Sequence, residues 1–463
     1  MEDNKPYASS LTTKAIALYK VDNENKPYIN LASMATHFQF FEDIFCPAYS
    51  GTLVVIDTGE NLISSMPIQG NEKIVIEVED AFGNNYSYDF RVWTVANRIS
   101  ADRRQIYTLG LISKEGLDNE RIKLATPRQG VTSTVVQKLL NEKLKVPTAR
   151  INSEHSRTSC KYIPKIQTSV FSFIRNLQLK TIPKKDHVGH VASNKKAKGG
   201  TSTGGDSEIG EGAQIVRDGG AGYVFYQSVR DGYSFVSFDG LVSKESIGSP
   251  FIYSPAKVED QNPNKIQEIV YDQEINMMKK LREGSYSSLT CFFNINTGKY
   301  EERLYSVENT WNEMVHLGSQ TGLPYGQCDQ SKTPTRVMST IVNNEFWYTG
   351  GDKASDDQKF LEKDYQQFHL QQALGRAGIL FTQQLTISLT GHLELAAGDI
   401  IDVRIPDQKA ESIKDEVWDQ ENSGYYLVRS LNHQFDIVDN SVYTVLSLIR
   451  DSQGIKNKES KIA

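Results

Sequence analysis

The sequence predicts a multi-domain α+β chain in which two related antiparallel β-barrels flank mixed helix and sheet domains. Three observations predict this class. The 463 residues exceed the roughly 250–300 at which one hydrophobic core stops growing, so several domains are expected. Apolar and polar residues alternate near both ends of the chain, which is typical of strands with one buried face. Between these ends the apolar spacing changes to three and four residues, which is typical of helices.

Composition and charge argue against some classes of protein. Hydrophobic residues make up 38% and charged residues 23%, with 22 Tyr and 19 Phe, which is enough to build packed cores. A net charge of -6 argues against a protein that holds nucleic acid through a basic face. The chain shows no secretory signal and no long apolar run, so we expect it to stay in the cytoplasm without membrane insertion.

The first predicted barrel covers residues 1–125. Four period-two segments lie between Gly51 and Ser113: GTLVVID, KIVIEVE, YSYDFRVWTV and QIYTLGLIS. The connection DAFGNN contains Gly83 and Asn84, which tolerate positive φ, so it predicts an antiparallel hairpin between the second and third segments. The earlier segment LTTKAIALYK is predicted to add a further strand.

Residues 126–260 are predicted to form a helix and small-sheet domain. GVTSTVVQKLLNEKL, limited by Pro147, and SVFSFIRNLQLK each carry apolar residues on one helical face. Residues 184–222 are rich in Lys, Gly, Ser and Thr, which predicts a flexible insertion. AGYVFYQSVRDGYSFVSFDGLV then predicts a hairpin at its Asp-Gly turn. The core-facing residues of this hairpin are expected to be Tyr223, Phe225, Tyr233, Phe235 and Phe238.

Residues 261–378 are predicted to be helical and mixed. NPNKIQEIVYDQEINMMKKLREG predicts a helix from near Pro263 to Gly284, broken at most once. The strand-like segments SSLTCFFNI and YEERLYS follow, and segment 286–306 is expected to supply a strand to the second barrel. SDDQKFLEKDYQQFHLQQALG predicts a helix of about twenty residues that ends at Gly375.

The second predicted barrel covers residues 379–451 and is followed by a polar tail, 452–463. Its segments QLTISLTG, GDIIDVRIP, GYYLVRSL and SVYTVLSLIR repeat the order of the first set. The matched features are Thr58-Gly59, Gly70 and KIVIEVE with Thr390-Gly391, Gly398 and IIDVRI, and Tyr107-Thr108-Leu109 with Tyr443-Thr444-Val445. The matches favour a duplicated domain, and two unrelated small barrels are the alternative.

Two segments resemble a known family. YSGTLVVIDTGENLISSMPIQGNEKIVIEVED, preceded by FEDIFCPA, resembles the opening barrel of baseplate hub proteins of contractile-tailed bacteriophages. GYYLVRSLNHQF followed by VYTVLSLIRD is similar to the end of their second barrel. The resemblance is strongest at residues 40–113 and 380–451. It extends to spike-base components of contractile injection systems, so it does not separate a phage from such a machine.

The resemblance implies a structural virion protein and not an enzyme. Two tube-type barrels per chain in a homotrimer would form a ring of pseudo-sixfold symmetry, which joins a threefold spike to the sixfold tail tube. The implied partners are the central spike protein, tail tube or tube-initiator proteins, baseplate wedge proteins and the tape-measure protein. DNA would pass through the lumen during ejection without specific binding. The expected location is the tail baseplate of the virion, after assembly in the host bacterial cytoplasm.

No segment carries a recognisable catalytic, cofactor or metal motif. His187 and His190 lack a third nearby ligand, and the glycines of GGTSTGG and RDGGAG match no phosphate-binding loop. His392 and His433 accompany no nucleophile motif and are interpreted as structural. We therefore predict no catalytic residue, cofactor or metal. The four cysteines form no CxxC pair and are expected to be reduced, mostly buried thiols: Cys46, Cys160, Cys291 and Cys328.

Two other functions stay open at this point. One is a tail-tip cell-wall hydrolase, a peptidase or muramidase, because the chain is rich in Asp and Glu that could form a catalytic pair. The other is a glycan-binding virion module that uses the many Tyr and Phe. In the loop from Lys409 to Ser423, Trp418 is either an anchor for a partner or packs back on its own barrel.

Overall fold

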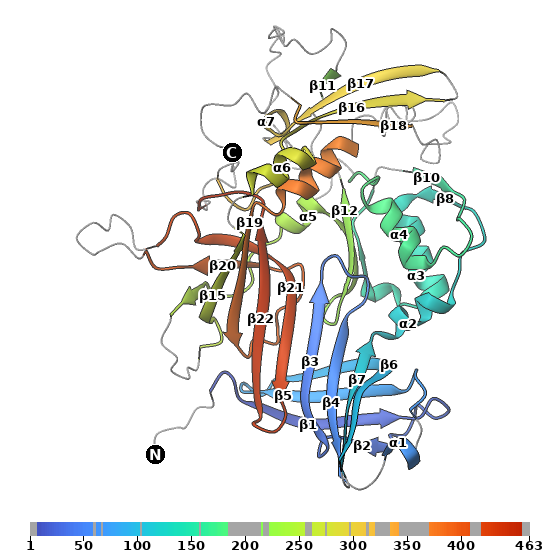
Figure 1. Cartoon of the computed structure of the whole chain (residues 1–463), viewed down its shortest axis with the longest axis vertical. Coiled ribbons are helices and arrows are strands. Elements are labelled where there is room, and N and C mark those ends of the chain that lie inside the picture. Colours follow the sequence, from blue (N-terminus) through green and yellow to red (C-terminus); the bar gives the residue numbers. More distant parts are fainter. Residues whose placement is uncertain are drawn as a thin grey trace.

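A computed structural model describes fourteen stretches of the chain. These are residues 7–58, 62–65, 68–101, 104–156, 159–183, 214–215, 222–254, 262–273, 276–295, 298–311, 314–319, 334–341, 370–407 and 418–455. The molecule is mostly β-sheet, with few helices among these residues, so the predicted α+β class overstated the helical share. Figure 1 shows the N-terminal strands at the lower end, the C-terminal strands beside and above them, helices at the right and a small sheet at the top.

The N-terminal half-sheet, named here for strands β1 to β7, contains all the strands predicted for the first barrel. Its elements are β1 (Leu11–Tyr19), β2 (Ile29–Asn30), β3 (Ala35–Asp43), β4 (Ser50–Asp57), α1 (Leu62–Ser65), β5 (Lys73–Asp80), β6 (Asn85–Ala101) and β7 (Arg104–Ile112). They are hydrogen-bonded in the order β2-β1-β5-β6-β7-β4-β3. The predicted hairpin joins β5 to β6, and its Gly83 has φ 86, a conformation that disfavours a side chain.

The C-terminal half-sheet contains six strands that form a closed ladder. They are β14 (Phe251–Tyr253), β15 (Lys265–Gln273), β19 (Gln383–Thr390), β20 (Ile400–Arg404), β21 (Gly424–Asp436) and β22 (Ser441–Arg450). The last four are the strands predicted from sequence. Because β14 pairs with both β15 and β20, the ladder returns to its first strand. No described ladder closes the N-terminal half-sheet in this way.

The helix predicted from Pro263 to Gly284 is wrong in its first half. Lys265–Gln273 is strand β15, and only α6 (Met277–Glu283) is helical, ending at Gly284 with φ 68. Ile266, Ile269 and neighbouring residues have helical spacing, but β-branched side chains also favour strands. The antiparallel ladder with β19 decides between the two, which is a tertiary contact that spacing does not reveal.

The prediction that segment 286–306 joins the second barrel is also wrong. β16 (Ser287–Asn294) and β17 (Lys299–Ser306) form a separate sheet with β18 (Arg336–Ile341) and β11 (Gln214–Ile215). The two strands pair with each other along their whole length through a turn at Gly298, so their hydrogen bonds are met locally. β14 and β15 take the place expected for this segment. α7 (Val307–Thr310) follows β17.

In the hairpin domain, the two helices and the Asp-Gly hairpin predicted for residues 126–260 are present. The elements here and just before residue 126 are α2 (Lys114–Arg121), β8 (Arg128–Val131), α3 (Thr132–Leu144), η1 (Thr148–Arg150), β9 (Ile151–Ser153), β10 (Ser159–Tyr162), α4 (Val170–Gln178), β12 (Tyr223–Ser228), β13 (Gly232–Ser237) and α5 (Phe238–Val242). Ser169 caps the N-terminus of α4, and its side chain accepts a hydrogen bond from the Ser172 N–H. All five residues expected to face the core are buried. Of the insertion 184–222, only residues 214–215 and 222 are described.

The two half-sheets repeat one strand order. The N-terminal order is β3-β4-β7-β6-β5-β1, and the C-terminal order is β15-β19-β22-β21-β20-β14. Corresponding pairs are antiparallel in both, except that β1 is antiparallel to β5 whereas β14 is parallel to β20. Strand order is a stronger indication of duplication than residue identity, because two unrelated meanders would not share all of these pairings.

Candidate functional site

The two half-sheets meet where β21 pairs with β3. Ser430–Asp436 runs antiparallel to His37–Asp43, so one hydrogen-bonded sheet continues across both halves. Aromatic rings cover the inner face of this junction. Phe38 stacks on Phe435 with ring centroids 5.0 Å apart, and Phe40 stacks on His433 at 5.8 Å. The three phenylalanines belong to one hydrophobic cluster that includes residues of both half-sheets, so the halves share a core.

Glu42 ties three segments together beside this junction. Its buried carboxylate accepts hydrogen bonds from the backbone N–H of Val229 at 2.6 Å and of Ala397 at 3.0 Å. Val229 lies in the β12–β13 turn and Ala397 in the β19–β20 connection, so the carboxylate bridges both half-sheets and the hairpin domain. Burial raises the pKa of Glu42 to about 7, although the two N–H donors act in the opposite direction.

Arg230 makes a second link between the hairpin domain and the C-terminal half-sheet. Its Nη2 and Nη1 atoms lie 2.6 and 2.9 Å from the two carboxylate oxygens of Asp399, which is a bidentate arrangement. Nη1 also donates to the Glu394 carbonyl at 2.9 Å. Since Asp399 is buried, this pair fixes the position of the hairpin turn on the β19–β20 connection.

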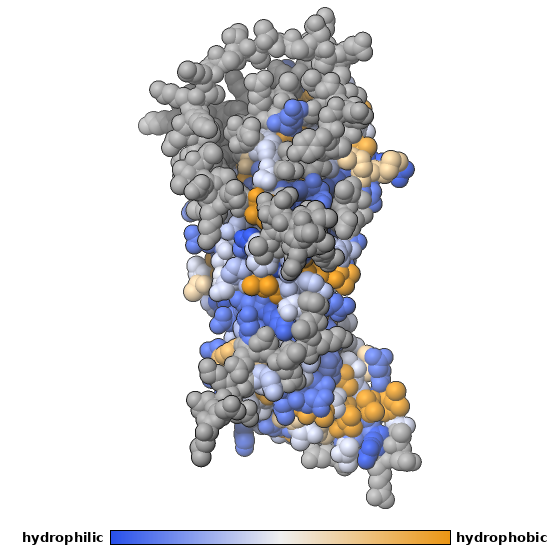
Figure 2. All heavy atoms as spheres, turned by 90° about the vertical axis from the view of Figure 1, so that its left-hand side faces the viewer, coloured by the Kyte–Doolittle hydropathy of each residue, from blue (hydrophilic) through white to orange (hydrophobic). Residues whose placement is uncertain are grey.

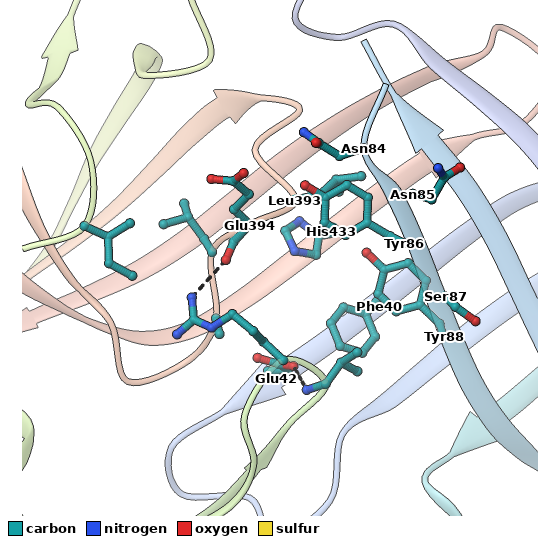
Figure 3. A pocket seen from close by; sticks show the side chains of 15 residues that line it. Phe40, Glu42, Asn84, Asn85, Tyr86, Ser87, Tyr88, Leu393, Glu394 and His433 are labelled. Atoms are coloured by element: carbon teal, nitrogen blue, oxygen red, sulfur yellow. Dashed lines mark hydrogen bonds between the residues drawn. The ribbon is translucent and has the colours of Figure 1, made fainter. Parts of the chain in front are cut away.

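A cavity of about 460 Å³ opens at the place where these three segments meet. Figure 3 shows Phe40, Tyr86, Tyr88 and His433 around it, and Leu393 also lines it. Three charged residues line the cavity: Glu42, Arg230 and Glu394. The side chains of Glu42 and Arg230 already have hydrogen-bond partners. The lining therefore offers aromatic contact together with the carboxylate of Glu394.

The two histidines interpreted as structural lie in and near this region. His433 is buried, its Nδ1 is 2.9 Å from the Thr444 hydroxyl, and burial lowers its pKa to about 3. Burial also lowers the pKa of His392, whose ring packs against Phe251 with centroids 5.5 Å apart. Neutral rings with these contacts suit a packing role. That neither histidine acts in catalysis stays a prediction.

The remaining candidates are only partly described. His187, His190, Cys328 and the two glycine motifs lie outside the described residues, apart from Gly222. The cysteine expectation is wrong for Cys46, which is an exposed free thiol, and Cys291 is half-buried. In the described stretches no three His, Cys, Asp or Glu residues gather as a metal site would require, and none of their helices is long and apolar enough to span a membrane.

The backbone of Trp418 and the start of the polar tail contact their own chain, and the role of the Trp418 side chain stays open. The backbone of Trp418 pairs with Pro406 at the end of β20, and its side chain is half-buried. Most of the loop that precedes it, 408–417, lies outside the described residues. Ser452 is buried, and its hydroxyl accepts a hydrogen bond from the Gly318 N–H at 2.5 Å. The predicted polar tail, 452–463, therefore starts with a residue that is part of the folded structure.

A buried acidic residue closes the turn before the corresponding strands β5 and β20. Glu72 accepts a hydrogen bond from the Gln69 N–H at 2.7 Å, and Asp399 accepts one from the Ala396 N–H at 2.8 Å. Both carboxylates accept from the residue three positions earlier, and both are buried. Sequence reasoning missed this pair, although an acid two residues after Gly70 and one after Gly398 is a visible signal.

The same two turns make identical backbone contacts with the long strands β6 and β21. Asn71 N–H donates to the Val92 carbonyl at 2.7 Å, and Gly398 N–H donates to the Val428 carbonyl at 2.8 Å. Asn71 and Gly398 both have positive φ, 75 and 89. Val92 therefore corresponds to Val428, and the residue that corresponds to Gly398 is Asn71 and not Gly70.

The Tyr-Thr match in the last strands is one residue out of register. Tyr107 is fully buried opposite Val55, whereas Tyr443 is 43% exposed. The residue buried at the corresponding place is Thr444, opposite Leu389. A shift of one residue in a strand exchanges its two faces, so the sequence match paired inward with outward residues. The duplicated strand order is present, but the alignment has to be drawn from the ladders.

Comparisons with known proteins give structural likeness alone. No family model matches the chain, and no curated protein matches it. A tail protein from Neisseria meningitidis MC58 is similar with a TM-score of 0.48 and 10% identity, covering 94% of this chain and 96% of that one. The 43 kDa tail protein of prophage MuSo2 from Shewanella oneidensis has a TM-score of 0.48 and 8% identity, covering 95% and 99%. The prophage tail protein gp18 from Listeria monocytogenes EGD-e has a TM-score of 0.40 and 10% identity, covering 97% and 96%.

Proposed function

We propose that this chain is a structural baseplate hub subunit, which assembles as a trimeric, pseudo-sixfold ring between the central spike and the tail tube. The observation that carries the proposal is the duplicated six-strand order, with its matched acidic turns, joined through β21 and β3 into one sheet. The sequence resemblance to hub proteins points the same way. The ring would form part of the DNA ejection conduit and would be located in the virion tail.

Duplication has a physical use in such a position. A homotrimer of a chain with two similar half-sheets presents six near-equivalent surfaces while it keeps exact threefold contacts elsewhere. One face can therefore match a threefold spike and the other a sixfold tube. The small sheet and the hairpin domain each occur once among the described residues, and they are available for threefold contacts. Tube or tube-initiator, wedge and tape-measure proteins are the further partners of this proposal.

The mass of the assembly in solution tests the proposal. Three copies of the 52.0 kDa chain would have a mass of about 156 kDa by light scattering, alone or with the spike protein added. Averaged electron micrographs of that species should show a ring with six similar lobes. A chain that stays monomeric even with its spike partner present contradicts the ring.

A role without catalysis is part of the same proposal. It is supported by the cavity beside Glu42, where the Glu42 carboxylate accepts hydrogen bonds from two backbone N–H groups and Arg230 donates to Asp399. A peptidoglycan zymogram with the purified full chain should show no clearing, with a lysozyme lane as positive control. Clearing that disappears in an Asp or Glu variant would replace the hub proposal with the tail-tip hydrolase.

A further inference from the structure

The junction between the half-sheets shows how two strands of this fold pair, and the equivalent pair of strands is not joined within the single chain. Along its first residues β21 pairs with β20 on one edge, and beyond them Ser430–Asp436 gives that same edge to β3. β22 occupies the other edge from Leu427 to Asp436. Each half-sheet thus contains one strand equivalent to β21 and one strand equivalent to β3. Within one chain, only one such pair of strands, β21 and β3, is joined by hydrogen bonds.

The strand that corresponds to β21 is β6. The backbone contacts of Val92 and Val428 align them, and each strand has a bulge just after this residue: between Val92 and Thr94, and between Val428 and Ser430. β6 has a second bulge, between Ala96 and Ile99, that β21 lacks, so beyond it the correspondence is taken from the ladder with β7. β5 pairs with β6 only as far as Arg91. Residues 94–100 therefore present the edge that β21 gives to β3, and no strand among the described residues pairs with it.

The strand that corresponds to β3 is β15. β3 pairs with β4 and β15 pairs with β19, and the buried residues Leu53 and Ile387 occupy the same position in these partners. On its other edge β15 meets β14 only at Lys265 and Ile266. From 268 to 270 that edge has no strand partner in the described part of the chain, and Figure 1 shows β15 at one side of the molecule.

Exposed apolar side chains lie at the matching positions of these two edges. In the junction Gln434 is opposite Gln39. The residues that correspond to them are Ile99, which lies opposite Ile106 in the ladder of β6 and β7, and Val270, which lies opposite Thr386. Ile99 is 61% exposed and Val270 is 46% exposed. Figure 2 also shows apolar side chains gathered at the lower end of the molecule, which the N-terminal half-sheet forms.

The charges on the two edges are opposite. Arg98 and Arg104 are exposed on and beside the free part of β6, whereas Glu268 and Asp272 are exposed on β15. A pair of β6 edges would place arginines together, and a pair of β15 edges would place carboxylates together. Opposite charges favour β6 with β15, and like charges disfavour either symmetric pair. The charges therefore select a head-to-tail contact, the kind that closes into a ring, over a twofold dimer.

We infer that β6 of one copy pairs antiparallel with β15 of the next copy, with Ile99 opposite Val270. This inference rests on the proposed ring and names the contact that builds it. The partner of both edges is a second copy of this chain. An unpaired strand edge readily accepts another strand, and here the accepted strand would repeat between copies the contact that β21 and β3 make within one.

Disulfide trapping tests the contact. The double variant Ile99→Cys with Val270→Cys, oxidised in the full chain, should give cross-linked bands at two and three chain masses on a non-reducing gel. Their yield should be at least about tenfold above that of either single variant, which keeps the four native cysteines as a background control. Gln39→Cys with Gln434→Cys is the matched positive control, because it should close within one chain and leave the mass unchanged.

The outcomes separate this inference from the proposed function. Cross-linked species in the designed double variant alone support the contact. A trimer by light scattering without the cross-link overturns the β6–β15 contact and leaves the ring in place. Neither trimer nor cross-link overturns both. A control that pairs Ile99→Cys with Val438→Cys, which is exposed at the β21–β22 turn, should cross-link no better than the single variants.

Discussion

At the scale of single residues, Glu42 makes the junction sensitive to pH. Its pKa is about 7 in the fold and about 4.5 without burial, so the folded chain holds the proton more tightly. The stabilisation of the fold by this bound proton is fully present below about pH 4.5 and is lost as the pH rises through 7. The difference corresponds to at most about 3 kcal/mol. From pH 5 to pH 8, the free energy of unfolding measured in urea should fall less in Glu42→Gln than in the unchanged protein. Equal decreases in the two proteins would contradict this assignment.

Arg376 is the residue whose loss should cost most. It is fully buried, its Nη1 lies 2.5 Å from an Asp451 oxygen, and its Nε lies 3.1 Å from an Asp239 oxygen. Burial alone would raise the pKa of Asp451, but Arg376 and a neighbouring histidine hold it well below its usual range. Arg376→Met removes the guanidinium that both buried carboxylates share, so it should reduce the free energy of unfolding at pH 7 by about 3–5 kcal/mol.

The control for that measurement is an exposed arginine. Arg336 donates to the Glu283 carbonyl at the surface, so Arg336→Met should change the free energy of unfolding by less than about 0.5 kcal/mol. If both variants lose the same amount in urea titrations, the buried cluster has no special role.

At the scale of elements, the role predicted for Gly375 is wrong. The sequence takes Gly375 as a helix end, yet the helix continues through residues 370–379. A Cβ at Gly375 would overlap the ring of Tyr305, so this glycine allows close packing inside a helix. Alanine favours a helix by about 1 kcal/mol, but overpacking costs about 1–3 kcal/mol, so Gly375→Ala should lower stability. In a Tyr305→Leu background the same change should become neutral or stabilising, and stabilisation with Tyr305 in place would contradict the overlap.

The elements show what the sequence could predict and what it could not. Period-two strands such as β4 and β22, and amphipathic helices such as α4, were predicted because burial follows directly from spacing. β15 was missed because its ladder with β19 depends on residues more than a hundred positions away. The site depends still more on such long-range contacts, because Glu42, Val229 and Ala397 share no local pattern that would connect them.

At the scale of the whole molecule, duplication was visible in the sequence but its alignment was not. Identities such as Tyr107 with Tyr443 pointed to the right strands in the wrong register. Diverged strands keep the alternation of buried and exposed positions longer than they keep particular residues, because the alternation is what packs a sheet. The ladder order and the paired turns of Glu72 and Asp399 therefore decide the alignment, and the same alignment gives the β6 and β15 edges their roles.

The charge of the whole assembly leads to a last prediction, about DNA. A trimer of chains with net charge -6 would carry about -18, so a duplex that enters its lumen would release few counterions and gain little free energy from contact. A conduit benefits from this, since tightly held phosphates would slow ejection. The trimer should not retard a 30-base-pair duplex, a length of about three helical turns, in a gel at about 50 mM salt, up to about 10 µM protein. Retardation that weakens steeply as salt is added would reveal a basic lumen and contradict a conduit through which DNA passes without being held.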